Sequence, residues 1–262
     1  MPVSWETAET PEPGMTRRRW VKLGLATAAF AAGAAATAGG VALLRPFLPP
    51  PAFVPPESFL DTLVYTGFPT AQWWNAKANT PVRVTDFALW SGASAVWRGA
   101  FTDTGAHVAG TGYPVLLVRV PRVDTYYELP SPLPWSLPPG FSLFYDDPAR
   151  DIRIVVGLDR CTHLCCYPGW HVVTNPPPGR DYLVPPPTYN VYDQDPIYCI
   201  CHGTQYDPLV LTQDTNPHNG VLFPGMKLVH TPGTFAMPLI PLRAVGDVLE
   251  GAMVDTRWYT YC

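Results

Sequence analysis

Two short stretches of the chain combine cysteine and histidine at spacings typical of metal ligands. Cys161 and His163 are separated by one residue, and Cys199 and His202 are separated by two. Thiolates hold ferric iron, and neutral imidazoles can replace two of them on one iron of a two-iron cluster, which raises its reduction potential. At these spacings both donor atoms of a stretch can reach one metal centre. The four residues therefore predict a 2Fe–2S cluster.

A zinc ion is the alternative occupant, because paired cysteines and histidines also form tetrahedral zinc sites. The second stretch, however, carries a further cysteine, Cys201, and the first ends in Cys166. Two hydroxyl side chains, Thr204 and Tyr206, follow in the second stretch. A zinc site does not account for these four residues, so the pattern favours iron and sulfur.

Both stretches resemble the Rieske iron–sulfur proteins. Residues 161–166, here called box one, read Cys-Thr-His-Leu-Cys-Cys, and the family reads Cys-Thr-His-Leu-Gly-Cys. Residues 199–207, called box two, read Cys-Ile-Cys-His-Gly-Thr-Gln-Tyr-Asp, and the family reads Cys-Pro-Cys-His-Gly-Ser-x-Tyr-Asp. The departures are Cys165 in place of glycine and Ile200 in place of proline.

The resemblance assigns roles to the residues around the cluster. In the respiratory branch a disulfide joins the boxes, which implies a bond between Cys166 and Cys201 that limits their opening. The family also places one hydroxyl on a bridging sulfide and one on a ligand sulfur, which implies Thr204 and Tyr206. Hydrogen bonds to cluster sulfurs stabilise the reduced form, so we expect a potential in the upper part of roughly −150 to +300 mV.

Three features near the boxes leave alternatives open. Cys165 and Cys166 compete for Cys201, and position favours Cys166; Cys165 and Cys262 could then pair with each other, although two unpaired thiols are the simpler expectation. Residues 175–196, which contain two Pro-Pro-Pro runs, are expected to form a surface excursion. Residues 232–238 are the nearest match to the third loop that covers the cluster in relatives. Their Phe235 and Met237 either shield the cluster or belong to the core or a surface turn.

The N-terminal region predicts export and membrane anchoring. Residues 1–15 form a tail, and residues 16–45 begin with a twin-arginine signal followed by 22 uncharged residues, 23–44. A helix of that length spans about 33 Å, enough for a bilayer core. Positive charges precede it, which predicts a single-pass protein of the cell membrane with a cytoplasmic N-terminus and an extracytoplasmic cluster domain. Cleavage of the signal at 34–39 is the alternative.

A proline-rich linker at 46–58 leads into a domain at 59–262 that predicts a mainly β fold. Alternating and continuous apolar runs separated by turns such as Asn219-Gly220 favour antiparallel sheets packed as a sandwich or small barrel. The resemblance implies a Rieske-type arrangement with a cluster-binding subdomain at about 159–238. We expect strands at 82–87, 113–120, 152–158, 226–230, 240–245 and 248–254.

Composition restricts the class of partner. The chain is 47% hydrophobic and 15% charged, which is not the composition of a disordered protein. Its net charge of −4 argues against nucleic acid and is compatible with a positively charged electron acceptor.

The resemblance and the export signal together imply the Rieske subunit of a cytochrome bc-type quinol-oxidising complex of the respiratory chain. Such a subunit is part of an oxidoreductase and is not catalytic alone. It takes one electron from quinol at a partner cytochrome b and passes it to a haem or copper acceptor, within a dimeric multi-subunit complex. His202 is implied as the catalytic residue, which contacts quinol and accepts a proton, and Leu164 as the tip that presses against cytochrome b.

Other functions compete with this expectation. An exported oxidoreductase such as arsenite oxidase also uses a Rieske subunit and the twin-arginine route. The ferredoxin of an aromatic-ring dioxygenase is a weaker match, because such ferredoxins are cytoplasmic and lack the disulfide cysteines. A structural zinc module is the remaining alternative.

Overall fold

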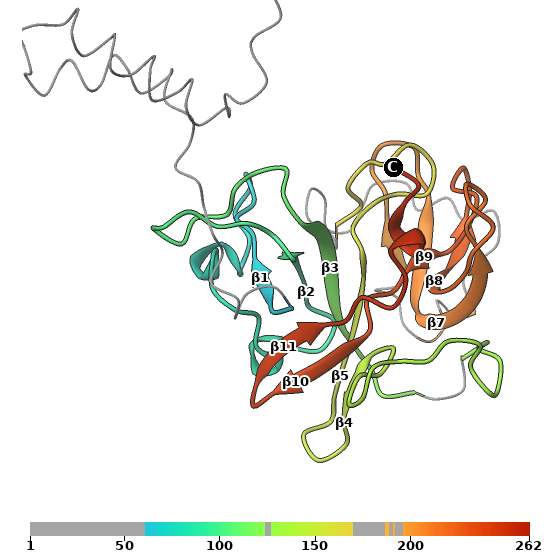
Figure 1. The fold of residues 1–262 in the computed structure, drawn as a ribbon, viewed down its shortest axis with the longest axis horizontal. Helices are drawn as coiled ribbons and strands as arrows, with labels where there is room; N and C mark the ends of the chain where they lie inside the picture. Colours follow the sequence, from blue (N-terminus) through green and yellow to red (C-terminus); the bar gives the residue numbers. More distant parts are fainter. Residues whose placement is uncertain (1–60, 124–126, 170–186, 189–190, 192–195) are drawn as a thin grey trace, which may run out of the picture. The chain divides into compact units, whose positions relative to one another are not determined.

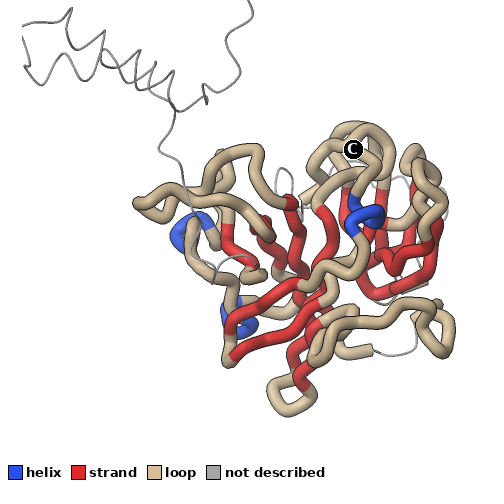
Figure 2. The backbone as a smooth tube through the Cα atoms, viewed as in Figure 1, coloured by secondary structure: helices blue, strands red, loops and turns tan. Residues whose placement is uncertain are grey.

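Strands make up most of the regular structure of this protein (Figure 2). The computed structural model describes residues 61–123, 127–169, 187–188, 191 and 196–262. All strand pairs within its sheets are antiparallel, so the expected mainly β, antiparallel fold is confirmed. The predicted tail, anchor and linker lie outside these residues, as does most of the excursion at 175–196. In the described part of the chain, no helix combines the length and apolar character needed to span a bilayer.

The larger sheet has five strands in the order β1-β2-β3-β5-β4. Its central strands β3 and β5 match the predicted runs at 113–120 and 152–158, and they pair from Val115–Leu158 to Val120–Arg153. Runs of valine, isoleucine and leucine favour a strand that is buried on both faces, and every residue of β5 is buried. The five strands are β1 Leu63–Tyr65, β2 Gly92–Trp97, β3 Tyr113–Val120, β4 Tyr145–Asp147 and β5 Ile152–Leu158.

The smaller sheet has four strands in the order β6-β7-β8-β9. Its long hairpin of β7 and β8 closes through a turn at Asn219-Gly220, as predicted, and Gly220 has a φ of +72°, which favours glycine. The predicted strand at 226–230 lies within β8. The four strands are β6 Ile197–Tyr198, β7 Gln205–Thr215, β8 Leu222–His230 and β9 Met237–Pro238.

A third, two-stranded sheet pairs β10 (Leu242–Val245) with β11 (Val248–Gly251). Both are shorter than the predicted strands at 240–245 and 248–254. The amide of Ile240 donates to the carbonyl of Val156 at 2.9 Å, so the chain just before β10 pairs with β5 instead.

The prediction of a strand at 82–87 is wrong, because Val84–Asp86 form a short 3-10 helix, η4. Val82 and Val84 are fully buried, which produces the alternation that favoured a strand. The chain then turns, and Asp86 accepts hydrogen bonds from Tyr65 and Lys77. The alternation of buried and exposed side chains therefore comes from a short extended segment, 82–83, followed by the turn of η4.

The described residues all belong to one compact unit, Phe53–Cys262, with two main groups of buried apolar side chains. Successive residues of β3 and β5 alternate between them. Leu117 and Ile154 belong to the group that also holds Trp97, whereas Leu116 and Val155 pack with residues of β7 to β9. Figure 1 shows β3 and β5 between β1–β2 and β7–β9. The two central strands thus join the two sheets into one domain.

Candidate metal centre

Box one directly follows β5, so a fully buried strand carries it. The amide of Cys161 donates to the carbonyl of Cys166 at 2.7 Å, and the amide of Cys165 donates to the carbonyl of Cys161 at 3.0 Å. These two bonds close residues 161–166 into a tight loop. The loop keeps Cys161 at its buried base and leaves Leu164 exposed at its tip.

Box two forms the turn between β6 and β7. The amide of Cys199 donates to the carbonyl of Thr204 at 2.8 Å, and the amide of Gly203 donates back to the carbonyl of Cys199 at 2.9 Å. Gly203 has a φ of +86°, a conformation that glycine adopts without steric cost. The hairpin therefore presents Cys199 inward and His202 outward.

The two predicted thiol ligands lie together. Cys161 and Cys199 are the free cysteines of the described residues, and they are 2% and 1% exposed. A hydrogen bond from Cys199 lowers the pKa of the Cys161 thiol, with further contributions from the His163 amide and the Tyr206 and Thr204 hydroxyls, and the same contact raises the pKa of Cys199. Two adjacent buried thiols can serve as a pair of soft ligands for a metal.

The two predicted imidazole ligands also lie together. The rings of His163 and His202 are 4.7 Å apart between centroids and perpendicular to each other. The Nδ1 atom of His163 is buried and has no hydrogen-bond partner in the described part of the chain. A buried nitrogen without a partner is costly unless a ligand satisfies it. The thiol pair and this nitrogen are therefore candidate metal ligands.

Hydroxyl groups surround the thiol pair. Tyr206 is fully buried and donates to Cys161 Sγ at 3.6 Å, the contact that the resemblance implies for it. Burial raises the pKa of Tyr206 well above its usual value, so the hydroxyl stays protonated and remains a donor. Thr204, the other predicted donor, accepts a hydrogen bond from the amide of Gly233 at 2.9 Å. This bond holds the Thr204 oxygen in place, while the Thr204 hydroxyl is one of the donors that lower the pKa of Cys161.

The loop at 232–238 lies against both boxes. In addition to the Gly233 contact with box two, the carbonyl of Phe235 accepts a hydrogen bond from Thr162 Oγ1 in box one at 2.9 Å. A Cβ atom on Gly233 would lie 2.5 Å from the Thr204 methyl group, so only glycine fits there. Phe235 and Met237 are both buried in core groups. The loop therefore braces the site through its backbone, and these two side chains belong to the core.

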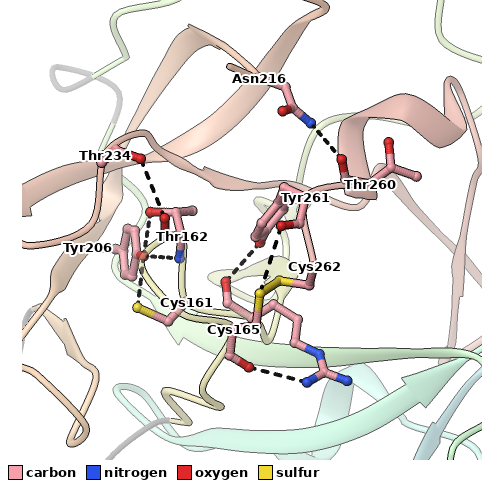
Figure 3. The surroundings of a disulfide bond; sticks show 10 residues. Cys161, Thr162, Cys165, Tyr206, Asn216, Thr234, Thr260, Tyr261 and Cys262 are labelled. Carbon is pink, nitrogen blue, oxygen red and sulfur yellow. Dashed lines mark hydrogen bonds between the residues drawn. A yellow bond between two sulfur atoms is a disulfide. The ribbon is translucent and has the colours of Figure 1, made fainter. Parts of the chain in front are cut away.

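Both disulfides of the described residues join box one to other segments. Cys166 is bonded to Cys201, as expected, which ties box one to box two. Cys165 is bonded to Cys262, so the expectation of two unpaired thiols is wrong. Figure 3 shows the C-terminal residues beside box one, where Tyr261 and Cys262 both contact it. The fold brings the chain end to the loop, and the sequence separation of 97 residues hides this proximity.

A second cysteine group lies close by. The sulfur atoms of Cys166, Cys199 and Cys201 are all within 4.8 Å of one another. Two of these sulfurs are bonded to each other, so only Cys199 has a free thiol to offer. Within the described residues, neither His163 nor His202 belongs to a group of three ligands this close together. The disulfide therefore lies beside the thiol pair and does not itself form a three-thiolate site.

Exposed side chains surround the imidazoles. Leu164 is 63% exposed at the tip of box one, and Ile200 is 45% exposed in box two. His202 is exposed, whereas His163 is half-buried. The predicted quinol-contacting residues, His202 and Leu164, thus both lie at the surface.

Sequence reasoning missed the roles of Thr162 and Tyr261, and it gave the Cys165–Cys262 bond only as an alternative. Thr162 donates its amide N–H to the Tyr206 hydroxyl at 2.8 Å, and the two hydroxyl oxygens lie 2.9 Å apart. Tyr261 donates to the carbonyl of Arg160 at 2.8 Å, and Cys262 completes the second disulfide. Thr162 was visible as part of the box-one pattern, whereas the two C-terminal residues have no local signal.

Comparison with models of known protein families finds no match for this chain. Comparison with curated proteins also finds no match. The resemblance to Rieske proteins therefore depends on the residues of the two boxes.

Proposed function

We propose that this protein is the Rieske iron–sulfur subunit of a membrane-bound, cytochrome bc-type quinol-oxidising complex. The observation that carries the proposal is the separate pairing of the donors. Cys161 lies against Cys199, while His163 faces His202 and has an unsatisfied buried nitrogen. The site would hold a 2Fe–2S cluster through these four residues.

This pairing favours a two-iron cluster over a single zinc ion. Four donors around one tetrahedral ion lie about 3.3–3.8 Å from one another, as follows from zinc–ligand bonds of about 2.0–2.3 Å. In the described residues, no histidine belongs to a group of three ligand atoms that all lie within 4.8 Å of one another. Two thiols at one side and two imidazoles at the other suit two metal ions, one for each pair.

The bound cluster would supply a one-electron acceptor with a raised potential. Tyr206 would increase that potential, because its buried hydroxyl donates to Cys161 Sγ. His202 would accept a proton from quinol, because it is the exposed member of the imidazole pair. Leu164 and Ile200 would contact the apolar surface around the quinol on a cytochrome b subunit.

The predicted anchor at 16–45 and linker at 46–58 complete the proposal. They would hold the cluster domain outside the cytoplasm, beside the cytochrome b subunit of a dimeric complex. The domain would then pass its electron to a haem or copper protein.

A redox titration of membranes that contain the full-length protein, followed by electron paramagnetic resonance (EPR), tests this function. We expect the spectrum of a reduced 2Fe–2S cluster that changes shape when quinone is extracted or a quinone-site inhibitor is added. Membranes with His202→Ala serve as the control and should lack the signal. A cluster signal that is indifferent to quinone and co-purifies with a molybdenum protein would contradict the quinol-oxidising role.

A further inference from the structure

The C-terminal segment 255–262 is firmly attached to the domain before it reaches box one. It begins with the 3-10 helix η5, Thr256–Tyr259, in which Trp258 is 1% exposed. The turn between β7 and β8 holds the same segment, because the side-chain amides of Asn216 and Asn219 both donate to the carbonyl of Arg257, at 2.9 and 2.8 Å. Its base is therefore fixed by core packing and by hydrogen bonds.

The last two residues then contact box one and the residue that precedes it (Figure 3). The Tyr261 hydroxyl donates to the carbonyl of Arg160, which directly precedes the ligand Cys161, at 2.8 Å. Cys262 is bonded to Cys165. The Arg160 side chain in turn donates to the carbonyl of Cys165 at 3.2 Å. The contacts of the chain end thus lie on both sides of Cys161 and His163.

Tyr261 also contacts the loop at 232–238. Its ring packs edge-to-face on Phe235, with centroids 5.0 Å apart. The carbonyl of Phe235 accepts a hydrogen bond from the Thr162 hydroxyl. The Thr162 amide donates to the hydroxyl of Tyr206, which in turn donates to Cys161. One aromatic side chain therefore supports the two backbone segments that hold the Cys161 sulfur and its donor.

The backbone conformation of Cys165 also indicates that the bond to Cys262 helps to hold box one. Cys165 has a φ of +61°, in the left-handed region that disfavours residues with a Cβ atom. Glycine occupies this position in the box-one pattern that the chain resembles, and it would adopt the conformation freely. The chain instead places a cysteine there, and that cysteine forms the bond to Cys262.

We propose that Tyr261 and Cys262 form a C-terminal clamp, in which both act as positioning residues for the ligands Cys161 and His163. The clamp would add a second tie on box one, independent of the Cys166–Cys201 disulfide. Loss of the clamp would leave the ligands present but less precisely held. The expected change in the EPR spectrum rests on the proposed function, because it requires a bound cluster. The expected change in the mobility of box one does not require the cluster.

The test compares two tyrosine variants of the full-length protein. Tyr261→Phe removes the hydroxyl that donates to Arg160, and Tyr259→Phe removes a matched hydroxyl that donates to the carbonyl of Leu239 at 3.0 Å, away from the boxes. Loss of one neutral hydrogen bond corresponds to roughly a two- to tenfold change in an equilibrium constant. We therefore expect amide hydrogen exchange of residues 161–166 to accelerate by about that factor in Tyr261→Phe only.

The second readout is the EPR spectrum of the reduced cluster. Tyr261→Phe should broaden or shift it, and Cys262→Ser should do so more strongly and speed the loss of the cluster. Tyr259→Phe should give the wild-type spectrum even where it lowers the melting temperature. The double variant Cys165→Gly, Cys262→Ser should fold, because glycine removes the backbone strain at position 165. Its spectrum should nevertheless be altered in the same way as that of Cys262→Ser, because the disulfide is still absent.

Two outcomes would overturn the clamp. One is wild-type exchange of residues 161–166 in both Tyr261→Phe and Cys262→Ser. The other is an equal change in Tyr261→Phe and Tyr259→Phe, which would show a general effect on stability. If the wild-type protein holds no cluster, the proposed function fails, and hydrogen exchange in the metal-free protein still decides the clamp.

Discussion

The five-stranded sheet and the two boxes are stabilised by different interactions. Side chains such as Trp97, Leu117 and Ile154 are fully buried in the sheet, so burial of apolar surface stabilises it. The boxes have Leu164 and Ile200 exposed, and two disulfides and several backbone hydrogen bonds hold them. Exposed side chains at the tips of these loops gain little from burial. Covalent bonds and hydrogen bonds therefore hold the exposed tips of the two boxes.

Removal of a ligand should have the largest effect on the site and little effect on the sheet. Cys199→Ser or His202→Ala removes one of the four donors, so we expect complete loss of the cluster, measured as iron and sulfide content and visible absorption. The far-ultraviolet circular dichroism should remain that of the wild type. Cluster-containing protein from either variant would overturn the ligand assignment.

Removal of a core side chain should have the opposite pattern. Trp97 is fully buried and packs against Tyr113 and Tyr259. We expect Trp97→Ala to lower the free energy of unfolding by about 3–5 kcal/mol. Leu89, which is 54% exposed, is the control, and Leu89→Ala should change it by less than about 0.5 kcal/mol. Equal effects in urea unfolding would show that burial does not distinguish these positions.

The Cys166–Cys201 disulfide should matter for both stability and cluster retention. Cys166→Ser opens a bond across 35 residues, and we expect the free energy of unfolding to fall by about 2–4 kcal/mol. The cluster should also be lost faster, because the boxes can separate. Peptide mapping of Cys165→Ser should still find the Cys166–Cys201 bond. A Cys165–Cys201 bond in the wild-type protein would contradict the pairing.

The Tyr206 hydroxyl should tune the cluster without determining the fold. We expect Tyr206→Phe to lower the midpoint potential by on the order of 60 mV, which is a tenfold change for one electron. Stability should fall by about 1–3 kcal/mol, because the buried amide of Thr162 loses the acceptor that it has at 2.8 Å. An unchanged potential in protein-film voltammetry would remove Tyr206 from the donors to the cluster.

The smallest effect concerns a polar contact of the sheet and depends on pH. Hydrogen bonds from Arg122 and Arg153 lower the pKa of Asp146. Its contribution to stability is therefore present above the unfolded-state pKa of about 3.9 and is lost as the pH falls through the lowered folded-state pKa. Asp146→Asn should cost only about 0.2–1 kcal/mol at pH 7, because the ion pair is partly exposed to solvent. A cost that persists undiminished at pH 2 would exclude this ionic origin.

The sequence predicted the central strands well and the connecting segments poorly. β3 and β5 are mostly apolar runs of eight and seven residues. A run of this length is typical of a buried strand and too short for a buried helix. The segment 82–87 has a strand-like pattern because Val82 and Val84 are buried, but the contacts of Asp86 turn the chain. β6 has only two residues, Ile197–Tyr198, and exists through its pairing with β7.

The site could be predicted where its residues are close in sequence. Cys161 with His163, and Cys199 with His202, each form a local pattern with a chemical meaning. The contact of Tyr261 with Arg160 spans 101 residues and depends on where η5 ends, so no local pattern reveals it. The partner of Cys165 likewise follows from the fold.

Pulsed EPR of the reduced protein tests the central claim most directly. We expect the cluster signal to show magnetic coupling to two histidine nitrogens, which changes to the 15N pattern when the protein is labelled with 15N-histidine. Such a result would place His163 and His202 on one iron of a two-iron cluster. A colourless protein that contains one zinc ion, or a cluster without histidine coupling, would contradict the account.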